Sequence, residues 1–282
     1  MVESLKQIKI RIRGIESTKK ITRAMEMVSI SKLKHIESFL NSHRSYFQAL
    51  ESIVDHTLRA SEGTGHMFFR GGKSAESVGV CVITSDAGLC GTYNNAVIKC
   101  AEDFAAQHNG KNISLVPVGK RGFTYFKKKT FRISRSFTGL NGRYSVPVAD
   151  EVAAALSRMF TDNQADEVYV AHMHFESLAR YRPVVTKLFP MEKTKERPMD
   201  FSFEPHGERI LDELLPWYIR AKIRLILVES FIAEHGCRMV AMKTASDNAK
   251  ELMDALVVMR NKARQAAITK EVIEIISSSG KI

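Results

Sequence analysis

The residue types best suited to chemistry gather in one short segment, 86–91, which reads Asp-Ala-Gly-Leu-Cys-Gly. It follows the apolar run 78–85, and the loop after a buried strand is the usual ligand position in a doubly wound α/β domain. The segment lacks the GxGxxG pattern of dinucleotide sites, because Gly88 and Gly91 lie only three residues apart and no acidic residue ends the second strand. Cys90 has no general base beside it in the sequence, as a nucleophilic thiol would need.

Two further candidates for chemistry also fail on spacing. The run 71–74 (Gly-Gly-Lys-Ser) resembles the end of a phosphate loop, but that pattern needs a glycine where Met67 stands and a preceding strand. His172 and His174 point to the same side of a predicted strand and could form a metal pair. We interpret them instead as part of a solvated edge strand. The sequence therefore predicts no catalytic residue, no cofactor site and no metal site.

The segments that would position these residues alternate between strands and helices. Such alternation predicts a small doubly wound α/β domain with a mostly parallel sheet, and two successive strands near its end predict an antiparallel edge. We predict strands at 78–85, 113–118, 131–137, 168–174 and 184–188, and helices at 95–107, 121–129 and 148–160.

A long C-terminal helix is predicted over residues 208–278. From Leu214 to Ala267, steps of four and three residues mark a seam in which thirteen of sixteen positions are apolar or aromatic. A period of 3.5 residues kept over about seven heptads is typical of a coiled coil. Some 70 helical residues would reach roughly 105 Å, so we expect this helix to protrude from the domain. Pro216 is expected at a kink or in the first turn.

An N-terminal helix over 3–59 is predicted to cover that seam. Its apolar spacing is regular from Leu33 to Val54 and again from Leu5 to Ile15, with a phase slip around residues 21–28. The two helices predict a long antiparallel coiled coil, with one end of the longer C-terminal helix unpaired. The expected domains are residues 1–60 (first helix), 61–206 (α/β domain with a proline-containing linker) and 207–282 (last helix).

Composition and charge limit the compartment and the partners. A hydrophobic fraction of 44% suffices for a core, no apolar run spans a bilayer, and the early charges Glu3 and Lys6 argue against a signal peptide. The four cysteines have no metal-ligand spacing and are expected to be reduced and mostly buried. The net charge is +11, and it is concentrated: residues 1–35 carry +6 and residues 111–145 carry +9. Two basic faces predict acidic partners: nucleic acid, anionic lipid or acidic protein.

Three segments resemble the gamma subunit of F-type ATP synthase, in the family's order and along the whole chain. They are 11–33 (around Lys-Ile-Thr-Arg-Ala-Met-Glu-Met-Val), 84–94 (Thr-Ser-Asp, Gly-Leu-Cys-Gly and an asparagine) and 242–271 (Met-Lys-Thr-Ala-Ser-Asp-Asn-Ala, Arg-Gln-Ala, Ile-Thr-Lys-Glu). The chain departs from the family at Gly14, Ser17, Lys19, Ala87, Thr92 and Tyr93. It lacks the cysteine-containing insertion of chloroplast members.

The resemblance implies a non-catalytic rotor shaft in the central stalk of a proton- or sodium-translocating ATP synthase. In the family the helix pair enters a hexamer of alpha and beta subunits, which carries the catalytic sites. The α/β domain and the base of the helix pair rest on the membrane c-ring together with epsilon. The resemblance thus implies a peripheral protein on the cytoplasmic face of the bacterial inner membrane, or on the matrix side in an organelle, with no cofactor.

The resemblance also implies which residues contact partners. Arg264 and Gln265 match positions that hydrogen-bond a loop of beta called the catch, and the basic residues near Met25 match a region placed against an acidic lever of beta. The full set of expected partner contacts is Lys19, Lys20, Arg23, Met25, Arg44, Tyr46, Met242, Lys243, Arg264, Gln265, Thr269 and Glu271.

Two other classes of function stay open from the residues alone. A basic coiled-coil protein could bind nucleic acid, with Phe123, Tyr125, Phe126 and Phe131 as stacking platforms, although these four fit a core equally well. A small-molecule enzyme could use the loop 86–91. The heptads by themselves predict a helical hairpin, and rotation follows only from the resemblance.

Overall fold

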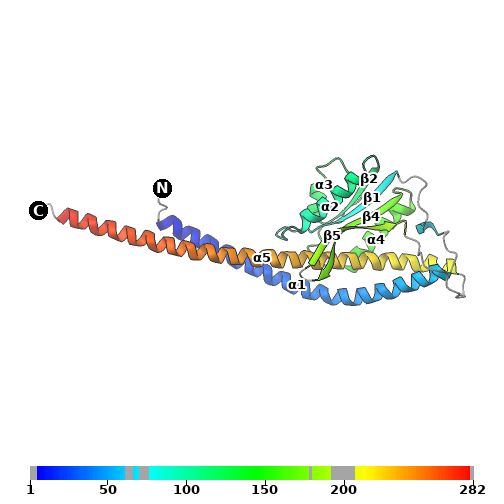
Figure 1. Cartoon of the computed structure of the whole chain (residues 1–282), viewed down its shortest axis with the longest axis horizontal. Helices are drawn as coiled ribbons and strands as arrows, with labels where there is room; N and C mark the ends of the chain where they lie inside the picture. Colours follow the sequence, from blue (N-terminus) through cyan, green and yellow to red (C-terminus); the bar gives the residue numbers. More distant parts are fainter. Residues whose placement is uncertain (1–4, 61–65, 70–75, 178–179, 192–206, 280–282) are drawn as a thin grey trace. The chain divides into compact units, whose positions relative to one another are not determined.

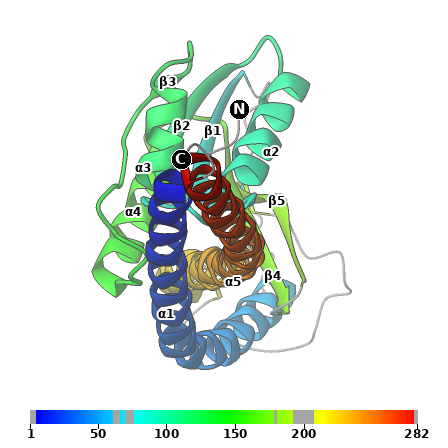
Figure 2. The ribbon, with the colours of Figure 1, turned by 90° about the vertical axis from the view of Figure 1, so that its left-hand side faces the viewer.

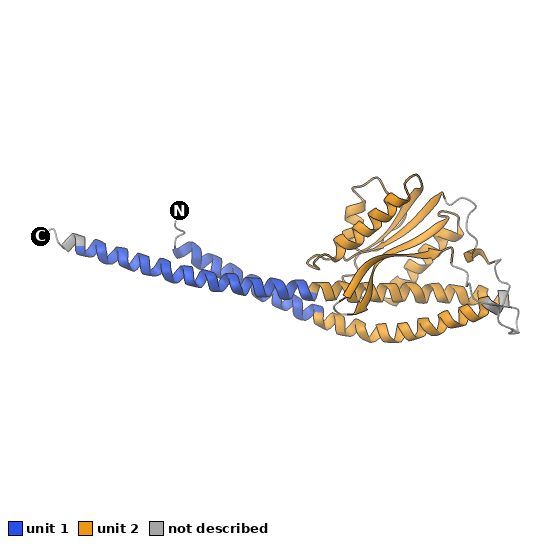
Figure 3. Ribbon diagram, in the orientation of Figure 1, with its two compact units in different colours: residues 1–29, 239–282 blue, residues 30–238 orange. Residues whose placement is uncertain are grey.

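The computed structural model describes residues 5–60, 66–69, 76–177, 180–191 and 207–279. The chain forms two compact units, one of residues 1–29 with 239–282 and one of residues 30–238 (Figure 3). Helices α1 (Leu5–Ala60) and α5 (Gly207–Ser279) each contribute to both units. Within each unit the two helices lie side by side and antiparallel (Figure 1; Figure 2), as the heptad spacing predicts. A short 3₁₀ helix, η1, spans Met67–Phe69.

The unit of residues 30–238 contains a five-stranded sheet in the order β3-β2-β1-β4-β5. The strands are β1 (Ser77–Ile83), β2 (Asn112–Val118), β3 (Arg132–Ile133), β4 (Glu167–Ser177) and β5 (Arg180–Phe189). β1 pairs in parallel with β2 and β4, β2 pairs in parallel with β3, and β5 runs antiparallel to β4. The predicted mostly parallel sheet with an antiparallel edge is confirmed.

Both faces of this sheet are covered, which explains the continuous apolar run in β1. Val78, Val80 and Val82 share a core with α2 (Tyr93–Gln107) and with Phe126 of α3 (Lys120–Phe126). Cys81 and Ile83 alternate with them and belong to a core shared with α4 (Val146–Thr161), α1 and α5. β1 is thus buried on both sides.

Helix α5 is the centre of this unit. Every residue from 226 to 238 is buried, which an amphipathic helix on a surface would not show. The burial arises because α1, α4 and the sheet all pack in the same core as this part of α5. A bidentate ion pair from Arg224 to Asp150, with distances of 2.7 and 2.6 Å, adds a polar link to α4.

The unit of residues 1–29 and 239–282 is a coiled coil whose seam is partly polar. Its buried residues are Ile8, Thr22, Glu26 and Ser29 on α1 and Met242, Ser246, Ala249 and Leu256 on α5. The hydroxyls of Thr22 and Ser246 lie 2.7 Å apart in the seam and share a hydrogen bond.

The predicted phase slip in α1 is wrong. Buried or half-buried residues follow unbroken steps of four and three at positions 8, 12, 15, 19, 22, 26, 29 and 33. Ile21 and Val28, which suggested the slip, are 58% and 55% exposed. The apolar pattern misled because Thr22, Glu26 and Ser29 take the seam positions there, and a hydroxyl can occupy a seam when a partner hydroxyl satisfies it.

Three other expectations need correction. The third strand has only two residues, and Phe137 joins the sheet through an isolated bridge to Val118. β4 is internal and not an edge, because β5 covers it. Pro216 lies inside α5, well past the first turn that begins at Gly207, so the first-turn alternative is wrong and the kink stays a prediction. The proline-containing linker expected before the last helix falls almost entirely outside the described residues.

Candidate functional site

The loop after β1 contains Asp86, the acidic residue of the segment 86–91 that was first considered as a ligand-binding site. The carboxylate of Asp86 accepts backbone N–H bonds from Lys120 (2.8 Å), Gly139 (3.2 Å) and Asn141 (2.6 Å). A carboxylate that accepts three backbone bonds from two separate segments joins those segments. Asp86 therefore fixes the turn before α3 and the loop before α4.

The thiol in the same loop is also engaged structurally. The amide of Asn94 donates to Cys90 Sγ at 3.0 Å, and the Asn94 side-chain oxygen accepts the backbone N–H of Ser85 at 2.9 Å. Among the described side chains, those hydrogen-bonded to this thiol are Ser85 and Asn94, and neither is a general base. The loop provides no pair of nucleophile and base of the kind that covalent catalysis uses.

A buried ion pair behind this loop escaped sequence analysis. Arg238 Nη2 lies 2.8 Å from Glu234 Oε1, and the same guanidinium donates to the backbone oxygens of Gly88 (3.3 Å) and Ala87 (3.4 Å). Burial raises the pKa of the Glu234 carboxyl, and the charge of Arg238 opposes that rise. The pair sits at i and i+4 in a stretch of α5 that is mostly apolar, and that spacing was the available sequence signal.

Next to this pair, His235 connects α5 to the loop before α4. Its Nε2 lies 2.8 Å from the carbonyl oxygen of Gly142, and burial lowers the pKa of His235 to about 4. From α1, the ammonium of Lys32 donates to the carbonyl of Asn141 at 2.8 Å. These contacts attach the loops to the helix pair within the unit of residues 30–238.

Each of the two histidines on β4 has a side-chain partner within the protein. His172 is buried, its Nε2 lies 3.0 Å from Thr186 Oγ1, and burial lowers its pKa to about 4. His174 Nδ1 lies 2.9 Å from Glu229 Oε2. No group of three or more potential ligands converges anywhere in the part of the chain that the structure describes. Because His172 lies on an internal strand, the solvated edge strand expected for these residues is wrong.

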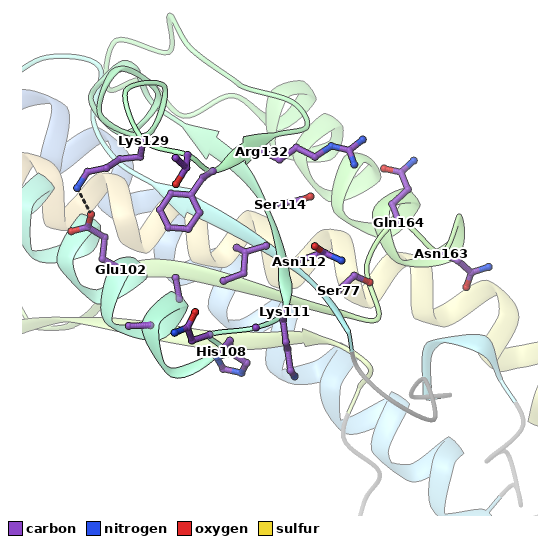
Figure 4. Close-up of a pocket in the computed structure, with 17 residues that line it drawn as sticks. Ser77, Glu102, His108, Lys111, Asn112, Ser114, Lys129, Arg132, Asn163 and Gln164 are labelled. Atoms are coloured by element: carbon purple, nitrogen blue, oxygen red, sulfur yellow. Dashed lines mark ion pairs between the residues drawn. The ribbon is translucent and has the colours of Figure 1, made fainter.

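A hollow of about 1050 Å³ lies at the amino ends of β1 and β2, bordered by Ser77 and Asn112 (Figure 4). Ligands of open parallel sheets bind at the opposite, carboxyl ends of the strands. On one side of the hollow Lys129 pairs with Glu102 at 3.4 Å. The remaining lining is mostly polar, and no set of groups converges on one point as in a binding site.

Three of the four aromatic residues considered as base-stacking platforms lie in or against the domain core, and the fourth, Phe123, is half-buried. Phe126 is 1% exposed and meets Tyr125 and Phe131 edge to face. Tyr125 and Phe131 are partly buried against the same core. A stacking platform must expose a ring face, so this arrangement does not favour nucleic-acid binding.

The expected partner contacts in the N-terminal part of α1 differ in exposure. Lys20 and Arg23 are exposed and form ion pairs with Glu16 (3.0 Å) and Glu26 (2.9 Å) of the same helix. Lys19 is half-buried at a seam position, and Met25 is half-buried beside the seam. On α5 of the same unit, Lys243 is exposed, whereas Met242 is 4% exposed within the seam.

The expected contacts at the C-terminal end of α5 are all exposed. Arg264 and Gln265 lie off the seam, while Arg260 and Ala263 remain half-buried in it. Thr269 and Glu271 are exposed as well, and the Thr269 hydroxyl donates to the Gln265 carbonyl at 3.0 Å. The apolar side chains of this end are exposed by 47–65% and are Ile268, Val272, Ile273, Ile275 and Ile276.

The remaining two expected contacts lie in the unit of residues 30–238. Arg44 Nη2 pairs with Glu229 Oε1 at 3.2 Å, which links α1 to α5. Tyr46 is 48% exposed. The structure thus distributes the twelve residues over both units, and it gathers Arg264, Gln265, Thr269 and Glu271 on one helical end.

These features define a class of protein: an antiparallel helical hairpin with an α/β domain, suited to contacts with other proteins. Within the described residues, no helix is long and apolar enough to cross a membrane. Residues 4–280 match the family described as ATP synthase. The chain belongs to the ATP synthase gamma-chain family, as the following relatives show.

The curated relatives match along their whole length. The chain is 32% identical over 279 residues to the ATP synthase gamma chain of Fusobacterium nucleatum, and the match covers 99% of each chain. It is 34% identical over 286 residues to the gamma chain of Chlorobium phaeobacteroides, covering 98% of each.

Solved structures share the fold. The rotor of the Euglena gracilis mitochondrial ATP synthase aligns with a TM-score of 0.66 at 14% identity, covering 94% of this chain and 98% of that one. The central stalk and c-ring structure of the Tetrahymena thermophila enzyme aligns with a TM-score of 0.60 at 24% identity, covering 80% and 99%. The predicted resemblance and fold class are thereby confirmed.

Proposed function

We propose that this chain is the central-stalk shaft of a proton- or sodium-translocating ATP synthase and couples rotation of the membrane c-ring to catalysis in the alpha/beta hexamer. The observation that carries the proposal is the C-terminal end of α5, where five isoleucine and valine side chains are 47–65% exposed. An apolar helix end of this kind is stable in an assembly when another protein surrounds it. Family membership supports an ATP synthase as that assembly.

The shaft acts without a catalytic site of its own. Asp86 and Cys90 are engaged in the structural contacts described above, so we assign ATP hydrolysis and synthesis to the beta subunits. The pure chain should hydrolyse no ATP, and turnover that survives removal of contaminating ATPase would contradict this assignment.

The partners we propose are the alpha and beta subunits around the coiled coil, and epsilon and the c-ring at the α/β domain. The contacts with alpha and beta would use the exposed residues Lys20, Arg23, Lys243, Arg264 and Gln265. Arginine can hold a carboxylate bidentately, which is worth about 1.5–3 kcal/mol when partly desolvated. The protein would be peripheral, on the cytoplasmic face of the plasma membrane.

The proposal is tested by replacing Arg264 and Gln265 together with alanine. Both side chains are exposed and off the seam, so circular dichroism and the melting temperature should not change. ATP hydrolysis by the complex with alpha and beta should fall. The matched control replaces Lys34 and Gln48, an exposed cation and amide on α1, and should retain activity. Full activity of the double variant would leave these two residues without a role in coupling.

A further inference from the structure

The chain contains two asparagine–glycine pairs, at 109–110 and 141–142, and both asparagines are exposed. In such a pair the backbone nitrogen of the glycine can attack the side-chain amide carbon of the asparagine, because glycine has no Cβ to hinder the approach. The reaction requires the asparagine side chain and backbone to rotate until these two atoms meet. A folded chain therefore reacts only where its contacts leave the pair free to rotate.

Both pairs occupy the central positions of β-turns that one backbone hydrogen bond closes. The closing bond is 3.1 Å long in the turn 108–111 and 2.9 Å long in the turn 140–143. In the first turn Gly110 has a φ of 97°, whereas in the second Asn141 and Gly142 have φ values of 51° and 65°, the two positive values of a type I′ turn. Exposure and turn closure are thus common to both pairs, and their other contacts distinguish them.

Three contacts hold Asn141 within the fold. Its backbone N–H donates to Asp86 at 2.6 Å, and its carbonyl accepts the ammonium of Lys32 at 2.8 Å. Its side-chain amide, the group that would be attacked, donates to the carbonyl of Gly139 at 3.1 Å. Rotation of this asparagine would break these bonds, so the reactive geometry is costly to reach.

The attacking glycine of this second pair is held as well. Gly142 is buried, and its carbonyl oxygen lies 2.8 Å from His235 Nε2. A Cβ atom at Gly142 would lie 2.8 Å from the same ring and 3.3 Å from Glu234 Oε1. Packing against α5 therefore leaves little space for the backbone of Gly142 to move.

The first pair has neither kind of restraint. Among the described residues, no hydrogen bond or ion pair is found for the side chain of Asn109 or for the N–H of Gly110. A Cβ atom at Gly110 would meet nothing within 4 Å. The pair borders the hollow of about 1050 Å³ between His108 and Lys111 (Figure 4). Both the side chain and the backbone of this pair can therefore rotate into open space.

We propose that Asn109 is a site of spontaneous deamidation in the folded protein, and that the contacts around residues 141–142 protect Asn141 from the same reaction. The nitrogen of Gly110 forms a bond to Cγ of Asn109, and the Cγ–Nδ2 bond breaks. Ammonia leaves with the proton of the Gly110 N–H, and a cyclic succinimide remains. Water then opens the ring at either carbonyl to give aspartate or isoaspartate, without an oxidant, a reductant or a cofactor.

The modification changes both charge and backbone at an exposed turn of the α/β domain. The new carboxylate would lie two positions from Lys111, whose ammonium pairs with Glu167 at 3.4 Å. Isoaspartate also lengthens the main chain of the turn, and it is the residue that repair methyltransferases recognise in aged proteins. The proposal does not depend on the rotary function, because the reaction takes place within the chain alone.

The test incubates the full chain, folded and in denaturing urea, at mildly alkaline pH, where the backbone N–H loses its proton more readily. Trypsin places the two asparagines on separate peptides, 100–111 and 136–143, and mass spectrometry follows the conversion of each. In the folded chain Asn141 should react at least about tenfold more slowly than Asn109, which corresponds to about 1.4 kcal/mol in the barrier. In urea the two rates should become similar, because both pairs lose their contacts.

Three controls identify the product and the cause of protection. From the folded chain, peptide 100–111 alone should accept a labelled methyl group from isoaspartyl methyltransferase. Asn109→Gln should remove this signal and leave Asn141 as slow as before. Lys32→Met removes one contact to Asn141, so it should raise the rate at Asn141 and leave Asn109 unchanged, with circular dichroism to check the fold. The proposal is overturned if Asn141 reacts as fast as Asn109 in the folded chain, if Asn109 reacts only in urea, or if Lys32→Met leaves the rate at Asn141 unchanged.

Discussion

Replacing Arg238 with methionine tests whether the buried ion pair with Glu234 fixes the loop after β1 to α5. Methionine retains an apolar stem but removes the guanidinium, which contacts Glu234 at 2.8 Å and donates to the carbonyls of Ala87 and Gly88. The side chains of Arg238 and Glu234 are only 8% and 2% exposed. Water therefore cannot readily replace the lost donor.

The expected loss is large because one charge would remain buried alone. Removing one partner of a buried ion pair destabilises a protein by about 3–5 kcal/mol, and a domain has only about 5–15 kcal/mol in total. Glu234 Oε2 already has no hydrogen-bond partner, so the carboxylate has no second donor to use. The double variant Glu234→Gln with Arg238→Met carries no buried charge, and we expect it to be more stable than Arg238→Met alone.

Urea unfolding followed by circular dichroism measures these free energies by linear extrapolation. Arg220→Met is the matched control, since Arg220 lies on the same helix, is exposed and contacts the Trp217 ring. A cation over an exposed ring contributes about 0.5–1 kcal/mol, so this control should lose no more than that.

The free energy of unfolding measured at lower pH tests the role of this ion pair independently. Burial raises the pKa of Glu234 above its ordinary 4.5, and removing Arg238 takes away the cation that opposes the rise. Between the unfolded and folded pKa values the folded state binds more protons, so its stability increases as pH falls through that interval. The defect of Arg238→Met should therefore shrink at lower pH. An Arg238→Met loss no greater than that of the control, or a double variant as unstable as the single one, would refute the reasoning.

Three further predictions concern single contacts. The pKa of His172 is lowered to about 4, so the folded state binds fewer protons than the unfolded state between about pH 6.5 and 4. The unfolding free energy should therefore fall on acidification by up to about 1.4 kcal/mol per pH unit. In urea titrations at several pH values, His172→Gln should reduce this dependence of the unfolding free energy on pH. Gly119→Ala should lower the melting temperature sharply, because φ is +95° and the new Cβ would lie 2.1 Å from a backbone oxygen. Gly14→Ala should instead stabilise the protein by about 0.5–1 kcal/mol, because Gly14 lies in a helix and its new Cβ would meet nothing within 4 Å. A Gly14→Ala variant that melts below Gly119→Ala would contradict both expectations. Thr22→Val should lower the free energy of unfolding by about 1–3 kcal/mol, because it leaves the buried Ser246 hydroxyl without its partner. Adding Ser246→Ala should restore part of the lost stability. Additive losses in the double-mutant cycle would show that the two hydroxyls are not coupled.

Sequence alone determined the long helices and the buried strand. The steps of four and three from Leu214 to Ala263 correspond to buried or half-buried positions in α5, because a helix that keeps one face covered must repeat its apolar residues at that period. The run 78–85 predicted β1 within two residues, since a strand covered on both faces has no polar alternation. The three segments that resemble the gamma subunit were equally readable without coordinates.

Tertiary structure alone decided the roles of the polar residues. Thr22 belongs to the seam because Ser246, 224 positions away in the chain, supplies its partner. Asp86 became a link between loops because the N–H groups of residues 120, 139 and 141 converge on it. His172 is buried because β5 pairs outside β4. An apolar period is a local property of the chain, whereas the partner of a polar group is set by contacts between distant segments, and only the fold brings those together.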